Sequence, residues 1–288
     1  MSKSTSICQI EMRASNYIAE EKSFKHICFN QKILKNDRDL ATICQEMKRD
    51  VDHNGFIVFN LSNICESLKD FCTTVSQLAA IFGNLMVQND LGHTVIEVFD
   101  RDIGTIEDGV RYHQTRQGGD IHTDSVNRPE PIRYLMLACA APAPIGGETI
   151  LIRAQDLYSK LLAFPNIIEV LQQDYYFEGR GMSQEYALFK IPVLKIGADG
   201  PRFRYLRSYI ASAHKNAGKP LSAKQIEAFD VLDALLETSS LQIRISLVKG
   251  DVLFIDDTAV FHGRTSFVDG KTEIKYADRR HMLRYWID

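Results

Sequence analysis

The sequence lacks the features that mark several specialised classes of protein. No apolar run approaches the roughly 20 residues that a membrane-spanning helix needs, and the N-terminal stretch MSKSTSICQIEMRASNYIAEEK has no apolar signal core. The formal net charge is −3, so there is no excess of basic residues of the kind that binds nucleic acid. These absences predict a cytoplasmic protein with no membrane or nucleic-acid partner.

Cysteine and serine also fail to form the patterns that indicate common sites. The six cysteines contain no Cys-x-x-Cys pair, which argues against a zinc site built on cysteine and favours reduced thiols. No Gly-x-Ser-x-Gly segment occurs, so the nucleophile elbow of a serine hydrolase is missing. The chemistry must therefore be sought in other residue types.

No internal repeat, low-complexity tract or linker rich in glycine and serine divides the chain. Its 288 residues are enough for one large domain. We therefore expect a single domain over residues 1–288, with a helical first third (1–90) that belongs to the same fold.

The apolar patterns that are present change in kind along the chain. Helical periodicity predicts helices over 37–51, 65–82, 154–164 (ended by Pro165) and 221–238 (capped by Ser222). Short strands are expected after the Asn54-Gly55 turn, near 94–96, and at 132–141, 148–154, 174–178, 185–196, 202–206, 241–247, 251–257, 259–263 and 281–287. This order predicts a mainly β fold, a jelly-roll core with helices packed outside it.

The segment GGDIHTDSVNRPEP contains the triplet His122-Thr123-Asp124. Composition alone leads one to expect about one His-x-acid triplet in this chain, and one occurs, so the triplet by itself proves nothing. Alternate residues of an extended chain point to the same side, so both side chains could reach one metal ion. A plain polar loop is the alternative.

A third ligand could come from His262, in the segment FIDDTAVFHGRTSF, just after an apolar strand. Two imidazoles and one carboxylate form a facial triad that leaves coordination positions open, as non-haem Fe(II) requires. A histidine at a strand end is more often only hydrogen-bonded, and a zinc hydrolase is a further alternative.

The C-terminal segment DRRHMLRYWID places Arg280 and Arg284 four residues apart, so a strand would present both on one face. Arginine in an apolar strand is costly unless it meets an anion, and its planar fork matches a carboxylate. A dicarboxylic cosubstrate could bind the metal at one end and arginine at the other. A surface strand with solvated arginines is the alternative.

Together these segments resemble the Fe(II)/2-oxoglutarate-dependent oxygenases of the TauD/TfdA, clavaminate-synthase-like family. The resemblance covers about residues 118–288 and rests on four motifs in the family's order. They are His122-Thr123-Asp124, Gly146-Gly147-Glu148-Thr149, His262-Gly263-Arg264-Thr265 and Arg280-His281-Met282-Leu283-Arg284.

The resemblance implies a double-stranded β-helix fold and a role for each matching residue. His122, Asp124 and His262 would bind Fe(II). Arg280 would bind the distal carboxylate of 2-oxoglutarate, with Arg279 as a competitor, and Thr149 would help to hold the cosubstrate. Arg284 matches a second arginine that meets substrate or cosubstrate in some members. Because an aspartate fills the carboxylate position, halogenation is disfavoured.

The implied reaction consumes O₂ and 2-oxoglutarate, releases succinate and CO₂, and hydroxylates an unactivated C–H bond. The family implies a small amino-acid-like substrate, free or tethered to a carrier protein, in specialised metabolism. Desaturation, cyclisation and a non-catalytic jelly-roll binding protein remain alternatives.

The substrate residues are predicted from local polarity. The polar segment 100–120 is expected to form a lid, in which Arg111, Gln114 and Arg116 would suit an amino-acid-like ligand. Leu206 stands where some relatives have an acid that holds a guanidinium substrate. Arg204 or Arg207 could instead meet a substrate carboxylate, with solvated surface arginine as the alternative.

Overall fold

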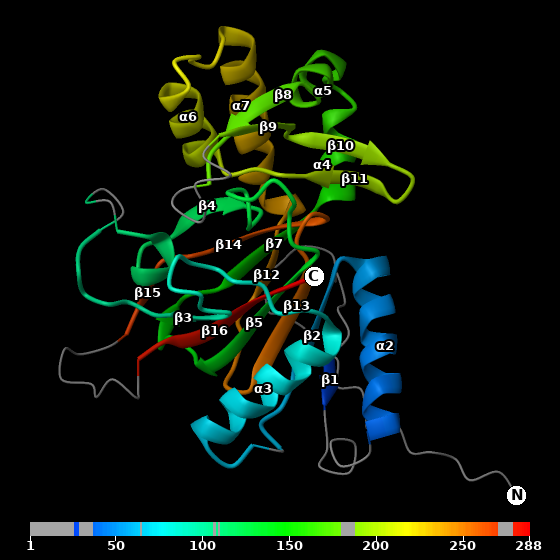
Figure 1. Ribbon diagram of the computed structural model, residues 1–288, viewed down its shortest axis with the longest axis vertical. Helices are drawn as coiled ribbons and strands as arrows, with labels where there is room; N and C mark the ends of the chain where they lie inside the picture. Colours follow the sequence, from blue (N-terminus) through cyan, green and yellow to red (C-terminus); the bar gives the residue numbers. More distant parts are fainter. Residues whose placement is uncertain are drawn as a thin grey trace, which may run out of the picture.

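Two β-sheets packed against each other form the centre of the computed structural model (Figure 1). The structure describes residues 26–28, 37–63, 65–105, 108, 110–179, 188–269 and 279–288. The large sheet has the strand order β1 (His26–Cys28), β2 (Phe56–Asn60), β13 (Asp251–Asp256), β5 (Tyr134–Ala141), β16 (His281–Ile287) and β3 (Val95–Val98). The small sheet has the order β12 (Ile243–Ile245), β7 (Thr149–Arg153), β14 (Val260–Arg264) and β4 (Gly119–His122).

The strands β2, β13 and β5 of the large sheet are buried on both faces, which explains their largely apolar sequences. Along β2, Phe56 and Val58 pack toward the small sheet, whereas Ile57 and Phe59 pack against two helices. These helices are α2 (Asp37–Asn54) and α3 (Leu68–Phe82), which cover the outer face of the large sheet (Figure 1).

The outer face of the small sheet is covered by a second group of elements. Ile152 of β7 and Phe261 of β14 pack there against the apolar side chains of helices and short strands. The group contains α4 (Ala154–Leu161), α5 (Pro165–Leu171), α6 (Arg207–Asn216), α7 (Ala223–Leu236), β8 (Asp174–Phe177), β9 (Phe189–Pro192), β10 (Leu194–Gly197) and β11 (Gly200–Phe203). Both sheets are thus shielded outside, and their facing surfaces enclose the interior.

The remaining elements are short: η1 (Tyr112–Gln114), β6 (Ile145–Gly146), η2 (Ser239–Leu241) and β15 (Phe267–Val268). The expected jelly-roll core with outer helices is confirmed. The expected cap at Ser222 is confirmed as well, since its side chain accepts a hydrogen bond from the backbone of Gln225. In the described part of the chain, no helix has the length and apolarity needed to cross a membrane.

Several boundaries differ from the sequence expectations for identifiable reasons. The helix expected from residue 65 begins at Leu68, because the Ser67 side chain caps it. Pro165 begins α5 instead of ending α4, which stops at Leu161; the fixed φ of proline suits a first helical turn.

Two expected strands have other bounds in the structure, and one helix was not expected. The strand expected over 185–196 is two strands, β9 and β10, in its described part, and β11 ends at Phe203 rather than 206. The apolar pattern does not predict α6, because no side chain caps its start and its apolar face is narrow.

The packing of Phe254 provides a test of the layer between α3 and the large sheet. Its ring centroid lies 4.4 Å from that of Phe82 and 5.0 Å from that of Tyr134. Phe254→Ala should lower the free energy of unfolding in urea by about 3–5 kcal/mol, through lost burial and the cavity left behind. In the control Phe164→Ala, at a side chain that is 43% exposed, the change should stay within about 0.5 kcal/mol. Equal losses in the two variants would contradict this packing.

Candidate active site

The two sequence-predicted histidines stand directly opposite each other on β4 and β14. Their antiparallel register pairs His122 with His262, and the ring centroids are 4.5 Å apart. The Nδ1 atom of His122 lies 2.7 Å from the carbonyl oxygen of Asp120. Because a carbonyl only accepts, Nδ1 carries a proton, and Nε2 is the ring nitrogen that faces Asp124.

Asp124 completes the cluster. It lies two residues after His122, the last residue of β4. Its Oδ1 atom lies 3.5 Å from Nε2 of His122 and 4.0 Å from Nε2 of His262. One ligand atom from each residue lies within 4.8 Å of the other two. The structure therefore brings together the three residues that the sequence predicted as ligands of one metal ion.

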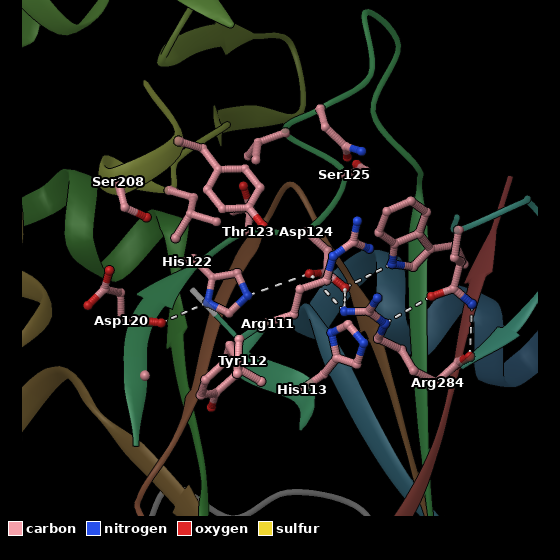
Figure 2. A pocket seen from close by; sticks show the side chains of 18 of the residues that line it. Arg111, Tyr112, His113, Asp120, His122, Thr123, Asp124, Ser125, Ser208 and Arg284 are labelled. Atoms are coloured by element: carbon pink, nitrogen blue, oxygen red, sulfur yellow. Dashed lines mark hydrogen bonds and ion pairs between the residues drawn. The ribbon is translucent and has the colours of Figure 1, made fainter. Parts of the chain in front are cut away.

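The other oxygen of Asp124 is held by the large sheet (Figure 2). Trp286 Nε1 donates to Oδ2 at 2.8 Å, and Arg284 Nη1 lies 3.1 Å from the same oxygen. Arg284 is itself fixed by Gln88, whose Oε1 accepts from Nε at 2.9 Å. These contacts leave Oδ1 directed at the two histidines, the arrangement of a carboxylate that binds through one oxygen.

The charges of the cluster suit ligation. Burial and the neighbouring His122 lower the pKa of His262 to about 3, so its ring is neutral at pH 7. Burial would raise the pKa of Asp124, but the positive charge of Arg284 and the contacts with the histidines hold it well below its usual range. The neutral imidazole of His262 and the ionised carboxylate of Asp124 are in the forms that bind a metal.

A second, fully buried carboxyl group, Asp257, lies next to Asp124 and His262. Its Oδ1 accepts a hydrogen bond from the backbone N–H of Asp124 at 3.0 Å and lies 3.7 Å from Nδ1 of His262. Burial and the negative charge of Asp124 raise the pKa of Asp257 well above its usual range. Asp257 therefore holds the backbone of Asp124, whereas its separation from the His262 ring is longer than a hydrogen bond.

A small cavity of about 60 Å³ opens from the histidines into the space between the sheets. Its lining includes His122, His262 and Thr149, the first residue of β7. It also includes three arginines and, among the residues that the structure describes, no aspartate or glutamate. The arginines are Arg264, Arg280 and Arg284.

Arg280 is the residue just before β16, and it lines this cavity. The side chain is 2% exposed, and its Nε and Nη1 atoms have no hydrogen-bond partner among the described residues. An added Cβ at Gly147 would lie 3.1 Å from Nε, so the turn residue makes room for the guanidinium. Arg279, its competitor, instead forms an ion pair with Asp102.

A larger cleft, of about 540 Å³, lies on the other side of the cluster (Figure 2). It shares Tyr112, His113, His122 and Arg284 with the small cavity, so the two spaces meet at the candidate metal ligands. Its lining includes Asp90, Arg111 and Asp120, together with Ser208 and Tyr209 from α6. Polar and apolar groups are therefore mixed around it.

The predicted substrate residues fall into two groups. Arg111 and Arg284 line the large cleft, whereas Gln114, Arg116 and Arg207 are not among its lining residues. Arg116 forms ion pairs with Asp100 and Asp102 at the beginning of the polar segment 100–120.

The two arginines of the segment 203–207, Arg204 and Arg207, have structural partners. Arg207 pairs with Asp230 and Asp233 of α7. Arg204 is buried and donates from Nη1 to the carbonyl oxygens of Arg128 and Pro129. Neither has its charge directed into the cleft.

Sequence reasoning missed four groups around the cluster: Tyr112, Asp257, Arg264 and Trp286. Arg264 and Trp286 stand two residues from His262 and Arg284, on strands, and this spacing could have revealed that they share a face with them. Nothing in the local pattern marks Tyr112 or Asp257, because each is brought to the site by the fold.

The chain has a single tryptophan, Trp286, and it donates to the candidate ligand Asp124. Anaerobic addition of Fe(II) should therefore quench or shift the fluorescence of the protein, with saturation at one ion per chain. His262→Ala should abolish the change, and His214→Ala, at a histidine on α6 outside both cavities, should preserve it. A fluorescence change that survives His262→Ala would contradict binding at this cluster.

Comparisons with known proteins agree with this geometry. The model of the family described as "Taurine catabolism dioxygenase TauD, TfdA family" matches residues 30–286. A taurine hydroxylase-like protein of Stachybotrys chartarum is 27% identical over 220 residues, or 72% of this chain and 54% of that protein. The chain thus spans about half the length of this curated relative.

Solved structures share the fold at low sequence identity. An asparagine oxygenase in complex with Fe(II), 2S,3S-3-hydroxyasparagine and succinate superposes with a TM-score of 0.69 at 14% identity, covering 91% of this chain and 93% of that one. The non-haem iron oxygenase OrfP, in complex with Fe and alpha-ketoglutaric acid, superposes with a TM-score of 0.62 at 17% identity, covering 90% and 85%. With the family match over most of its length, the chain belongs to the TauD/TfdA family of dioxygenases.

Proposed function

We propose that this protein is an Fe(II)- and 2-oxoglutarate-dependent oxygenase that hydroxylates an unactivated C–H bond of a small amino-acid-like substrate, free or tethered to a carrier protein, in specialised metabolism. The observation that carries the proposal is the small cavity, which joins a His–Asp–His cluster to three arginines. A ligand that binds a metal at one end and carries a carboxylate at the other would contact both the cluster and the arginines.

The donor set supports iron. Two imidazole nitrogens and one carboxylate oxygen, held on one side of an ion, leave positions open for a chelating cosubstrate and O₂. His122 and His262 would supply the nitrogens, and Asp124 would supply Oδ1. Trp286 and Arg284 would keep the other oxygen of Asp124 away from the ion.

The buried guanidinium supports a dicarboxylic cosubstrate. Arg280 presents unpartnered N–H groups in a cavity without an acid among the described residues, so an anion from outside would complete its hydrogen bonds. Thr149 stands at the same cavity with its hydroxyl available as a further donor. A zinc hydrolase would leave these groups without a role.

When bound, iron and 2-oxoglutarate supply the oxidising chemistry with O₂ and release succinate and CO₂. The protein orients the cosubstrate through Arg280 and Thr149. The buried walls between the two sheets exclude water from the reacting end.

The large cleft would hold the substrate next to the ligands. Arg111 can meet a carboxylate, and the carboxylates of Asp90 or Asp120 can meet an amino group, so the lining suits a zwitterion. The structurally similar enzymes solved with hydroxyasparagine and with hydroxyarginine support an amino-acid-like ligand.

The adjacent arginines 279 and 280 give a matched test of the cosubstrate site. Anaerobic titration of the Fe(II) protein with 2-oxoglutarate should produce a weak visible charge-transfer band. Arg280→Ala should weaken binding by about 100-fold or more, because the carboxylate loses a buried charge-assisted partner. Arg279→Ala, whose guanidinium pairs with Asp102, should leave the affinity within a few-fold of the unmodified protein. The reverse order would assign the role to Arg279.

A panel of amino acids, scored by succinate release and by mass spectrometry of the product, tests the substrate class. Arg111→Ala should raise KM for the best substrate by about ten-fold, through loss of a charge-assisted contact. Arg207→Ala is the control, because its charge is paired with α7. A product heavier by one oxygen supports hydroxylation, whereas one lighter by two hydrogens indicates desaturation or cyclisation. Unchanged KM in Arg111→Ala would contradict the assigned contact.

A further inference from the structure

The small cavity contains more positive charge than a single carboxylate-binding arginine requires. Arg264 is 6% exposed and lines the cavity with Arg280. Burial lowers the pKa of Arg280 to about 10, with a further contribution from the positive charge of Arg264. Two like charges in one buried space are unfavourable unless an anion is shared between them.

Part of the Arg264 side chain has a structural role, and part has none. Its Nη2 donates to the carbonyl oxygens of Thr115 and Gln117, which ties the polar segment to β14. Its Nε and Nη1 atoms are buried without a hydrogen-bond partner among the described residues. Nε and Nη1 lie on different sides of the planar guanidinium, with Cδ between them, so each can donate a single hydrogen bond to an anion.

Tyr112 adds a third buried hydrogen-bond donor without a partner among the described residues. Its hydroxyl is buried and has no hydrogen-bond partner among the described residues, and the residue lines the same cavity. Its ring lies beside that of His122 (Figure 2), with 6.0 Å between centroids. An added Cβ at Gly119 would lie 2.2 Å from this ring, so the glycine is required for the ring to occupy its place.

Aromatic rings hold the three groups together. The guanidinium carbon of Arg264 lies 4.6 Å from the Tyr112 ring centroid and 4.7 Å from that of Phe267. The guanidinium carbon of Arg280 lies 5.0 Å from the same Phe267 ring. Both arginines are therefore fixed by stacking before any ligand arrives, and little side-chain entropy remains to be lost on binding.

We propose that Arg264 and Tyr112 bind the distal carboxylate of the cosubstrate together with Arg280, as a three-residue clamp. This inference rests on the proposed function and extends it, since neither residue belongs to the set predicted from sequence. The clamp would make the far carboxylate a strict requirement, so the site would select a 2-oxo dicarboxylic acid over a 2-oxo monocarboxylic acid of equal length.

A pair of probes separates the two ends of the cosubstrate. 2-Oxoglutarate and 2-oxopentanoate share the metal-chelating end and the chain length, but only the former has a distal carboxylate. Binding of each to the Fe(II) protein would be measured anaerobically, by the charge-transfer band and by the fluorescence of Trp286. The variants are Tyr112→Phe and Arg264→Lys, with Tyr176→Phe on β8, outside both cavities, as control.

Tyr112→Phe retains the ring and its packing, so it isolates the hydroxyl even if Arg264→Lys loosens the polar segment. Each variant should weaken 2-oxoglutarate by about 10-fold or more and leave 2-oxopentanoate unchanged, and the control should change neither. If Tyr112→Phe and Arg264→Lys both bind 2-oxoglutarate normally, or weaken both acids equally, the clamp is wrong while the proposed function stands. If the unmodified protein binds neither acid, the proposed function fails, and the clamp with it.

Discussion

The pairing of β4 with β14 is the constraint on which the site depends. It sets His122 opposite His262 and carries the chain from there directly to Asp124. Because side chains alternate along a strand, a slip of one residue would turn His122 out of the interior. Gly263 follows His262 on β14. An added Cβ there would lie 3.0 Å from the Ile121 side chain of β4, so the lack of a side chain favours the close approach of the two strands.

Because helices cover the outer face of each sheet, the register of β4 and β14 decides which side chains enter the space between the sheets. Apolar residues on the outer faces of both sheets are covered by α2 and α3 on one side and by α4 to α7 on the other. The space between the sheets is therefore apolar at its centre, and the histidines and arginines of the small cavity lie at one end of it. Three of the charged groups at that end are held by hydrogen bonds: Asp124 by Trp286, Arg284 by Gln88, and Arg264 by two backbone carbonyls.

The sequence predicts the fold class from local apolar patterns, and it predicts the three candidate ligands from four short motifs that occur in the order of the family. Long apolar strands, Ser222 and the order of four short motifs are legible without coordinates. The substrate residues are harder, because charge alone does not tell whether a side chain faces a cleft. Arg207 and Arg111 look alike in sequence, yet one pairs with α7 and the other lines the cleft. Arg284, expected to meet a ligand, also holds Asp124, a contact between residues 160 positions apart.

The charge of the buried end has a thermodynamic consequence. Three arginines line the small cavity, and Arg284 forms an ion pair with Asp124. A divalent cation entering this end adds charge of the sign already in excess, whereas a dianion removes it. Metal and dicarboxylate are thus counterions to each other, and linkage requires each to tighten the other's binding by the same factor. Under the proposed function, iron retention is therefore coupled to the supply of the cosubstrate.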